Sequence, residues 1–490
     1  MLTAKELEDK GRQALAWVDE RFPLSVLYKT HVSEYYAPKN FNFWYLFGSM
    51  ALLVLVIQIV TGIFLVMHYK PDASLNAAGV PVAFASVEYI MREVPGGRFI
   101  RYMHSTGASM FFIVVYLHMF RGLLYGSYRK PRELVWLFGM AIFLCLMGEA
   151  FFGYLLPWGQ MSGWGAQVIV NLFAAIPVIG PDLSVFIRGD FVVSDATLNR
   201  FFAFHVIAIP LVLLGLVTAH LIALHEVGSN NPDGVEIKER KDEQGIPLDG
   251  IPFHPYHVVK DVLGAVVLLI VFSIIVFFMP EGGGYFLEYN NFMPYDQLKT
   301  PPHIAPVWYF TPYYSMLRAT TSSFLPFLWL LVALIVGLTW RGCSCVWIRR
   351  ACLLVVAGAY WGFFGLTLFG FTKPPFDLAI AGIHLGLGLD AKFWGVVMMG
   401  GSVMLFALLP WLDRSPVRSI RYKGVLYKAI LAVFVICFLI LGYYGTQPPS
   451  PVGNVVSQIC TILYLAYFGL MPWYSKLDKC KPVPERLTWK

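Results

Sequence analysis

Two apolar stretches decide the fold: RYMHSTGASMFFIVVYLHMFRGLLY at residues 101–125 and RFFAFHVIAIPLVLLGLVTAHLIAL at residues 200–224. Each is long enough to cross a bilayer as a helix, which takes about 20 apolar residues. Each also carries two histidines, one near either end: His104 and His118 in the first, His205 and His220 in the second. Ionisable side chains inside a bilayer are costly and mark functional sites, so these four histidines are the first candidate residues.

The spacing of the histidines predicts where they lie on their helices. His104 and His118 are fourteen residues apart, which in a helix is about 21 Å along the axis and close to four whole turns. Both side chains therefore face nearly the same way, at two depths of a hydrocarbon core about 30 Å thick. The second pair is fifteen apart and overshoots four turns by about 60°. A local adjustment is needed, and Pro210, which can kink a helix, lies between the two.

The composition of the whole chain indicates a membrane protein. Of its 490 residues 57% are hydrophobic and 14% charged, whereas soluble domains carry roughly 25% charged residues. About ten apolar runs are long enough to span a bilayer. The net charge of +7 comes from Lys and Arg in short loops between these runs, which matches the positive-inside rule and argues against a nucleic-acid partner. We therefore expect an all-α integral membrane protein with about ten transmembrane helices.

The apolar runs divide the chain into five parts. We expect a surface segment at residues 1–40, a four-helix bundle at 41–260, a fifth helix with a long loop at 261–319, a helical hairpin at 320–389, and three helices with a basic tail at 390–490. The hairpin would contain spans at 320–340 and 351–372, and residues 161–199 would form short surface helices. Both termini then lie in the cytoplasm, and Cys343, Cys345 and Cys352 beside a basic loop are expected to be free thiols.

Four histidines matched in depth on two helices predict two haem sites. A six-coordinate haem iron takes one imidazole on each side, so His104 would pair with His205 and His118 with His220. A lone membrane histidine is more often merely packed, but four matched ones are not readily explained in that way. Glycines with the same fourteen-residue spacing, where a macrocycle edge could approach the backbone, are Gly48, Gly62, Gly139 and Gly153. Arginines near the ligands that could pair with haem propionates are Arg101, Arg121 and Arg200. Helix packing through small residues and snorkelling arginines are the alternatives.

Several motifs resemble cytochrome b of the respiratory cytochrome bc complex. They are Arg-Tyr-Met-His at 101–104, Pro-Trp-Gly-Gln at 157–160, Arg-Phe-Phe-Ala-Phe-His at 200–205, His-Glu-Val-Gly-Ser-Asn-Asn-Pro at 225–232 and Phe-His-Pro-Tyr at 253–256. The likeness covers about residues 15–319 and 390–475. It is therefore specific and involves most of the chain.

The resemblance implies a redox subunit of a quinol–cytochrome c reductase. In that family quinol is oxidised near the outer membrane face and quinone is reduced near the inner face, with electrons crossing through two b haems, which contributes to a proton gradient. His104 and His205 would hold the outer, low-potential haem, and His118 and His220 the inner, high-potential haem. The expected quinone is ubiquinone. The expected partners are a Rieske iron-sulfur protein, a membrane-anchored c-type cytochrome, lipids and a second copy of the complex, all in a bacterial inner membrane.

The resemblance also implies two quinone pockets. Matches to the inner, quinone-reducing pocket are His225, Ser229, Lys260 and Asp261; an ordinary solvated loop is the alternative. The outer pocket would include Pro306, Val307 and Tyr309, and Tyr309 could orient the quinol. The family loop usually reads Pro-Glu-Trp-Tyr, but here position 307 is Val, which cannot accept a proton. We expect Glu149, an acid inside the third span, to replace the missing one.

Residues 320–389, with their two extra spans and His384, form an insertion relative to most of that family, for which we expect a structural contact. Two other classes of protein are alternatives. A di-haem membrane anchor of a dehydrogenase or hydrogenase would need only one quinone site, and the paired quinone motifs argue against it. A transporter would show broken helices and internal repeats instead of matched His and Gly spacings.

Overall fold

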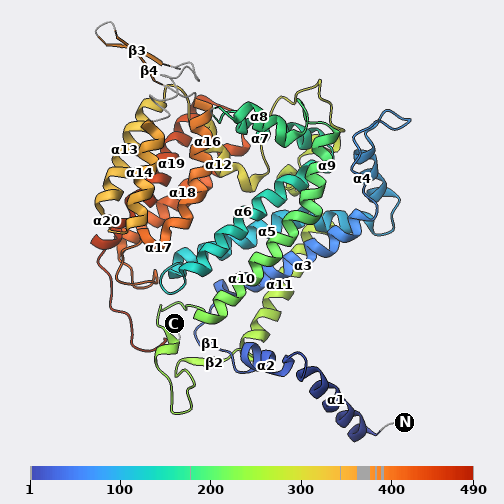
Figure 1. The fold of residues 1–490 in the computed structure, drawn as a ribbon, viewed down its shortest axis with the longest axis vertical. Helices are drawn as coiled ribbons and strands as arrows, with labels where there is room; N and C mark the ends of the chain where they lie inside the picture. The colour runs from blue at the N-terminus through green and yellow to red at the C-terminus, as the bar shows by residue number, and fades with distance from the viewer. Residues whose placement is uncertain are drawn as a thin grey trace.

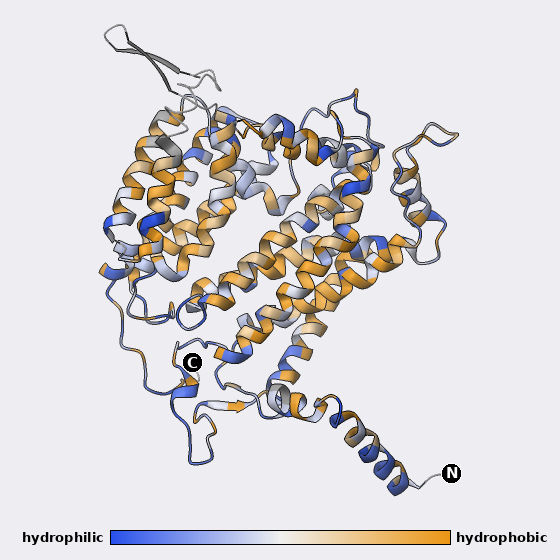
Figure 2. Ribbon diagram, viewed as in Figure 1, coloured by the Kyte–Doolittle hydropathy of each residue, from blue (hydrophilic) through white to orange (hydrophobic). Residues whose placement is uncertain are grey.

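The structure, a computed structural model, describes residues 3–176, 178–342, 344–360, 376–380, 383–387 and 391–488. Most of these residues are helical, and among them eight helices are long and apolar enough to cross a membrane. Hydrophobic residues cover these central helices, whereas hydrophilic residues gather in the connecting loops and the N-terminal helix (Figure 2). The prediction of an all-α membrane protein is therefore confirmed.

The first half of the chain forms the predicted four-helix bundle, whose slanted helices lie side by side in Figure 1. α3 (Phe47–Val66) packs mainly against α5 (Gly97–Tyr125), and α6 (Glu133–Leu155) packs mainly against α10 (Ile209–Val227). α11 (Tyr256–Phe278) packs on α3 and α5. Long uninterrupted helices suit these apolar sequences because a helix satisfies its backbone hydrogen bonds internally, as lipid requires.

The helix that carries the second histidine pair contains an irregular turn. α9 (Asp195–Ala203) continues into a π-turn, η3 (Phe204–Ala208), which leads directly into α10. The N–H of Ile209 donates to the carbonyl of Phe204, five residues back, so this turn holds one residue more than an α-helical turn. The π-turn is the adjustment that the fifteen-residue spacing requires. It precedes Pro210, which we expected to cause the adjustment and which instead opens α10.

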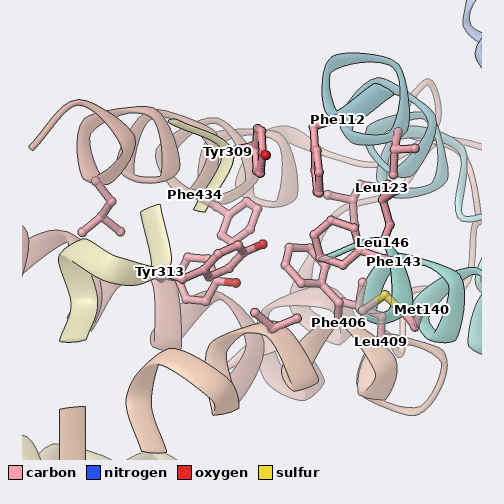
Figure 3. Packing of buried hydrophobic residues seen from close by; sticks show 14 of the residues in the cluster. Phe112, Leu123, Met140, Phe143, Leu146, Tyr309, Tyr313, Phe406, Leu409 and Phe434 are labelled. Carbon is pink, nitrogen blue, oxygen red and sulfur yellow. The ribbon is translucent and has the colours of Figure 1, made fainter. Parts of the chain in front are cut away.

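The second half of the chain joins the bundle through an aromatic core. Its helices are α12 (Thr311–Ala319), α16 (Ala391–Met404), η9 (Leu405–Leu408), α17 (Leu409–Leu412), α18 (Val425–Thr446), α19 (Pro451–Gly469) and α20 (Met471–Leu477). Figure 3 shows Phe112, Phe143, Tyr309, Phe406 and Phe434 from both halves in one cluster. The rings of Phe112 and Tyr309 stack with centroids 3.9 Å apart. Such aromatic contacts add to the stabilisation from burial, so the loop that carries Tyr309 is held against α5.

The predicted hairpin at 320–389 contains two packed helices. They are α13 (Leu325–Gly342), which also contacts α19 and α20, and α14 (Val346–Tyr360). Neither is among the eight candidate spans found in the described residues. Residues 361–372 of the predicted second span, like Cys343, lie outside the described residues, so ten spans stay a prediction. His384 lies in β4 (Ile383–Leu387), which pairs antiparallel with β3 (Phe376–Ile380).

Short elements connect the long helices. Near the N-terminus they are α1 (Ala4–Asp19), α2 (Leu24–Tyr28), η1 (Lys29–Ser33), β1 (Tyr36–Pro38) and η2 (Phe43–Leu46). Those that follow are α4 (Val82–Arg92), α7 (Gln160–Phe173), α8 (Gly180–Arg188), η4 (Ile237–Glu239), β2 (Gly250–Pro252), η5 (Gly282–Gly284), η6 (Tyr289–Phe292) and η7 (Trp308–Phe310). The short helices predicted within 161–199 are confirmed as α7 and α8, although α9 continues into a span. β1 and β2 pair antiparallel and tie the N-terminal segment to the loop before α11. Cys345 is a free thiol, as predicted.

Candidate functional site

Two pairs of histidines face each other within the bundle. We call His104 and His205 the outer pair, and His118 and His220 the inner pair. The two ring centroids are 6.0 Å apart in the outer pair and 6.4 Å apart in the inner pair. A metal ion that binds two imidazole nitrogens at about 2 Å would hold the ring centroids about 6 Å apart. The spacing of each pair therefore suits one iron between its two rings.

A glycine lies against each of the four imidazoles. A Cβ atom built on each glycine would lie against the Cε1 atom of one histidine. These distances are 3.2 Å for Gly48 and His118, 3.2 Å for Gly62 and His104, 3.5 Å for Gly139 and His220, and 2.4 Å for Gly153 and His205. Any side chain on Gly153 would therefore collide with the His205 ring. At the other three glycines a Cβ atom would lie closer to the ordinary contact distance from the imidazole ring.

The second ring nitrogen distinguishes the two pairs. At the outer level, Nδ1 of His104 is 3.0 Å from the Thr61 hydroxyl oxygen. Nδ1 of His205 is 2.9 Å from the Glu149 carboxylate and 3.0 Å from the Glu149 backbone carbonyl oxygen. At the inner level, Nδ1 of both His118 and His220 is buried without a hydrogen-bond partner among the described residues.

The four histidines are arranged as two separate pairs. Within the described part of the chain no cluster of three or more His, Cys, Asp or Glu side chains could hold a bare metal ion. A pair of imidazoles at about 6 Å with backbone-only surfaces behind both rings suits a flat macrocycle, whose own nitrogens complete the coordination of iron. The residues present therefore fit two haem sites.

Two of the three predicted arginines lie close to these sites. Arg101 is buried, lines the cavity at the outer pair and donates to the Ser105 hydroxyl at 3.3 Å. Arg121 has a buried Nε without a hydrogen-bond partner among the described residues, and its guanidinium lies 5.0 Å from the Tyr45 ring centroid. The guanidinium of Arg200 is exposed and donates to the Phe186 carbonyl of α8. The structure therefore does not bring Arg200 to the outer cavity.

A cavity of about 300 Å³ opens beside the outer pair, within the size range of ligand pockets. Both outer histidines line it, and so do Glu149, Val307 and Tyr309. Pro306 lines a smaller neighbouring cavity that shares Val307 and Tyr154 with the first. The structure thus gathers the residues predicted for the outer quinol pocket around one histidine pair.

An acid that sequence reasoning missed is hydrogen-bonded to the wall of this cavity. The Tyr154 hydroxyl, on the cavity wall, donates to the Glu288 carboxylate at 2.7 Å. Burial raises the pKa of Glu288 to about 7, against the lowering effect of the Tyr154 hydrogen bond. The two residues are 134 positions apart, so no sequence spacing could reveal the pair. A pKa near 7 suits a carboxyl group that takes up and releases protons at neutral pH.

The residues predicted for the inner quinone pocket lie where α10 ends and α11 begins. His225 stacks on Tyr35 with ring centroids 4.6 Å apart, and Tyr35 lies near Ser229. Asp261 accepts a hydrogen bond of 2.9 Å from Ser49 of α3. Lys260 is exposed.

Other residues at this end of the bundle were not identified from the sequence. Tyr35, which connects His225 and Ser229, belongs to the segment that we expected only to lie on the membrane surface. Ser49 holds Asp261. His257 on α11 is buried, and its Nε2 has no hydrogen-bond partner within the described residues. Their roles depend on contacts between distant segments, although the motif around Phe253 indicated this end of the bundle.

Two family models match most of the chain. The model described as cytochrome b/b6/petB matches residues 32–228, and the model described as cytochrome b (C-terminal)/b6/petD matches residues 294–340 and 379–465. This chain belongs to the cytochrome b family. The first match contains all four histidines and all four glycines, and the interval at 341–378 lies within the predicted insertion.

Relatives within the cytochrome b family match nearly the full length. The chain is 54% identical over 478 residues to cytochrome b of Allochromatium vinosum, covering 97% of this chain and 98% of the relative. It is 41% identical over 465 residues to cytochrome b of Cereibacter sphaeroides, covering 94% and 90%. A solved structure named hyperthermophilic respiratory Complex III matches with a TM-score of 0.71 at 33% identity, covering 94% of this chain and 98% of that one.

Membership of the cytochrome b family implies that the chain binds b-type haem. It also identifies the chain as an integral membrane protein of respiratory electron transport. The family assignment and the geometry agree on the same four helices, because the histidine pairs lie inside the region matched by the first family model.

Proposed function

We propose that this chain is the cytochrome b subunit of a quinol:cytochrome c oxidoreductase that works by a Q cycle. The observation that carries the proposal is the arrangement of two facing imidazole pairs at two levels of one bundle, with ring centroids 6.0 Å apart in one pair and 6.4 Å apart in the other. Two haems bound there would carry single electrons across the membrane between the two quinone pockets. His104 and His205 would hold the outer haem, and His118 and His220 the inner one.

A potentiometric haem titration of the purified complex tests this proposal. Two b-type haems of distinct midpoint potential are expected, and one haem or none would overturn it. A matched pair of variants assigns them. His104→Ala should remove only the outer haem, and His118→Ala only the inner one, as measured by the haem content per complex and the absorption spectrum.

The other residues of the haem sites would act on the propionates and the macrocycle. Arg101 and Arg121 are the cations available at the outer and inner levels, and a guanidinium pairs well with a carboxylate. Arg200 would pair with a propionate only in a conformation in which its exposed guanidinium no longer donates to the Phe186 carbonyl. The four glycines would let the macrocycle edges approach the backbone.

At the outer cavity the chain must accept protons from the quinol that is oxidised. Oxidation of one quinol to quinone releases two electrons, one to the iron-sulfur partner and one to the outer haem, and two protons. We assign Glu149 as one proton acceptor, because its Oε2 is buried without a partner among the described residues and the side chain lines the cavity. Tyr309, also on the wall, would orient the quinol, while Pro306 and Val307 shape the pocket.

The Tyr154 and Glu288 pair provides a second proton acceptor at the same cavity. The Tyr154 hydroxyl can pass a proton from the cavity to Glu288, to which it already donates a hydrogen bond. Two acids for two protons would explain how the pocket functions although position 307 is Val. Measuring quinol oxidation in Glu149→Gln tests the first assignment, and near-normal turnover with intact haems would contradict it.

At the inner end we assign His225, Ser229, Lys260 and Asp261 to a quinone-reducing pocket that takes up protons. An imidazole and a carboxyl group near the quinone carbonyls would be suitable proton donors. His225→Leu and Asp261→Asn should each slow reduction of the inner haem by quinol in the reverse direction, with the outer site inhibited. The exposed Lys260 is expected to contribute least.

The partners follow from the same proposal. A Rieske iron-sulfur protein would take the first electron, a membrane-anchored c-type cytochrome would receive it, and the complex would be a homodimer with bound lipid. Ubiquinone is the proposed quinone, and the bacterial inner membrane the proposed location, with both termini in the cytoplasm. Affinity purification through a C-terminal tag should recover both partners, and protease accessibility of that tag in inside-out and right-side-out vesicles checks its side.

A further inference from the structure

The outer pair differs from the inner pair at two matched positions. On α6, Glu149 lies four residues before Gly153, and its carboxylate is 2.9 Å from Nδ1 of His205. Fourteen residues earlier, Val135 lies four residues before Gly139, and Nδ1 of His220 has no hydrogen-bond partner among the described residues. Within the described residues, only the outer level therefore has a carboxylate on the ligand.

The partner helix repeats the difference. On α3, Thr61 precedes Gly62, and its hydroxyl is 3.0 Å from Nδ1 of His104. Fourteen residues earlier, Phe47 precedes Gly48 and offers no polar atom to His118. Both polar partners of the outer ligands are thus replaced by apolar side chains at the inner level.

We propose that Glu149 is a positioning residue that fixes His205 and holds the outer haem at a lower reduction potential than the inner haem. This rests on the proposed bis-histidine haem sites and goes beyond them. An imidazole that binds iron through Nε2 carries its proton on Nδ1, where the Glu149 carboxylate accepts it in a hydrogen bond. Such partners orient the ring and raise its donor strength.

The direction of the effect follows from charge. The oxidised haem iron carries one positive charge more than the reduced one, so a carboxylate attached to its ligand stabilises the oxidised form. The half-buried position of both side chains, each about one-sixth exposed, weakens solvent screening of this interaction. The neutral Thr61 hydroxyl on His104 acts in the same direction but more weakly, because hydrogen bonds to ionised groups are roughly twice as strong as neutral ones.

One carboxylate can serve both this role and proton acceptance. Oε1 of Glu149 contacts His205, and Oε2 has no partner among the described residues and belongs to a side chain on the cavity wall. The two roles are separable by experiment, because a reduction potential is measured at equilibrium without quinol turnover.

Redox titration of the purified complex carrying Glu149→Gln tests the proposal. Gln keeps the size of the side chain and an oxygen acceptor for the Nδ1–H but removes the charge. At a given ambient potential the ratio of reduced to oxidised outer haem should rise about tenfold, which is 59 mV for a one-electron couple. The inner haem in the same sample is the control and should not move. An unchanged outer haem overturns the proposal, whereas loss of the two-haem titration in the unmodified complex would overturn the proposed function itself.

The matched inner position allows the reverse experiment. Val135→Glu places a carboxylate beside His220, and Val135→Gln places a neutral side chain of the same size there. The ratio of reduced to oxidised inner haem should fall severalfold in the Glu variant and stay near that of the parent in the Gln variant. If both variants shift the inner haem equally, charge is not the cause and the proposal is overturned. If Val135→Glu does not retain the inner haem, Glu149→Gln alone decides.

A spectroscopic measurement checks the positioning part of the role. Glu149 fixes the plane of the His205 ring, so Glu149→Ala should change the low-spin ferric electron paramagnetic resonance signal of the outer haem only. Glu149→Asp, which keeps the charge on a shorter side chain, should restore part of the potential. An outer signal unchanged in Glu149→Ala would contradict a positioning role.

Discussion

The outer and inner levels of the bundle share one backbone plan and differ in their polar surroundings. At both levels two imidazoles face each other at about 6 Å, with a glycine behind each ring. Among the described residues, only the outer level has hydrogen-bond partners on its second ring nitrogens, and a cavity of about 300 Å³ lies beside it. The repeat along the helices therefore sets where the ligands lie, whereas single side chains such as Glu149 set what each level can do.

The largest expected effect comes from the glycines behind the rings. A Cβ at Gly153 would lie 2.4 Å from His205, whereas one at Gly139 would lie 3.5 Å from His220. Gly153→Ala should therefore abolish binding of the outer haem, and Gly139→Ala should leave the inner haem largely bound. Haem content per complex and the reduced-minus-oxidised spectrum measure both. Equal losses of haem in the two variants would contradict the expected difference in space between glycine and imidazole at the two levels.

A smaller effect is expected from Glu288, the acid that is hydrogen-bonded to Tyr154 on the wall of the outer cavity. The pKa of Glu288 is raised to about 7 by burial, so its carboxylate, the proton-accepting form, predominates above that pH. Quinol oxidation should rise with pH through about 7, and Glu288→Gln should lower the rate by about 10²-fold, a typical contribution of a positioned base, and flatten this rise.

The titratable neighbours that face Glu288 are Tyr154 and Tyr309. Tyr154→Phe tests the other part of the proton route, because it removes the hydroxyl on the cavity wall and leaves the carboxyl group of Glu288 in place. Turnover should fall in this variant also. A pH profile in Glu288→Gln identical to that of the parent would exclude this acid from the proton route.

The smallest shift is expected at Thr61. Thr61→Val removes a neutral hydrogen bond of 3.0 Å to His104 and keeps the side-chain shape. The ratio of reduced to oxidised outer haem should rise by about threefold, less than in Glu149→Gln, in keeping with the weaker neutral bond. Redox titration checks this order, and a larger shift in Thr61→Val than in Glu149→Gln would reverse the comparison of the two partners.

The sequence was most informative where function depends on spacing along one helix. The spacing of the histidines predicted two facing pairs, which the structure shows, because helical geometry turns a spacing into a direction. It also identified Glu149 as a buried acid. It could not identify His205 as the partner of Glu149, since the contact depends on how α6 and the helix that carries His205 pack.

Features that depend on contacts between distant segments escaped sequence reasoning. The Tyr154 and Glu288 pair and the Tyr35 and His225 stack are of this kind. The surroundings of Arg200 are of the same kind. Its guanidinium donates to the Phe186 carbonyl of α8, a contact that its position five residues before His205 does not indicate.

The π-turn at Phe204–Ala208 has a consequence for how this helix can vary. The turn contains His205 and adds one residue between it and His220, so a deletion within residues 206–208 can be absorbed by closing the turn into a regular α-helix. A deletion in the regular part of α10, between residues 211 and 219, would instead rotate His220 by about 100° unless the π-turn closed as well. The spacing between the two histidines of this helix can therefore change by one residue at the π-turn. Homologues that differ in this spacing would keep both histidines at the same depths.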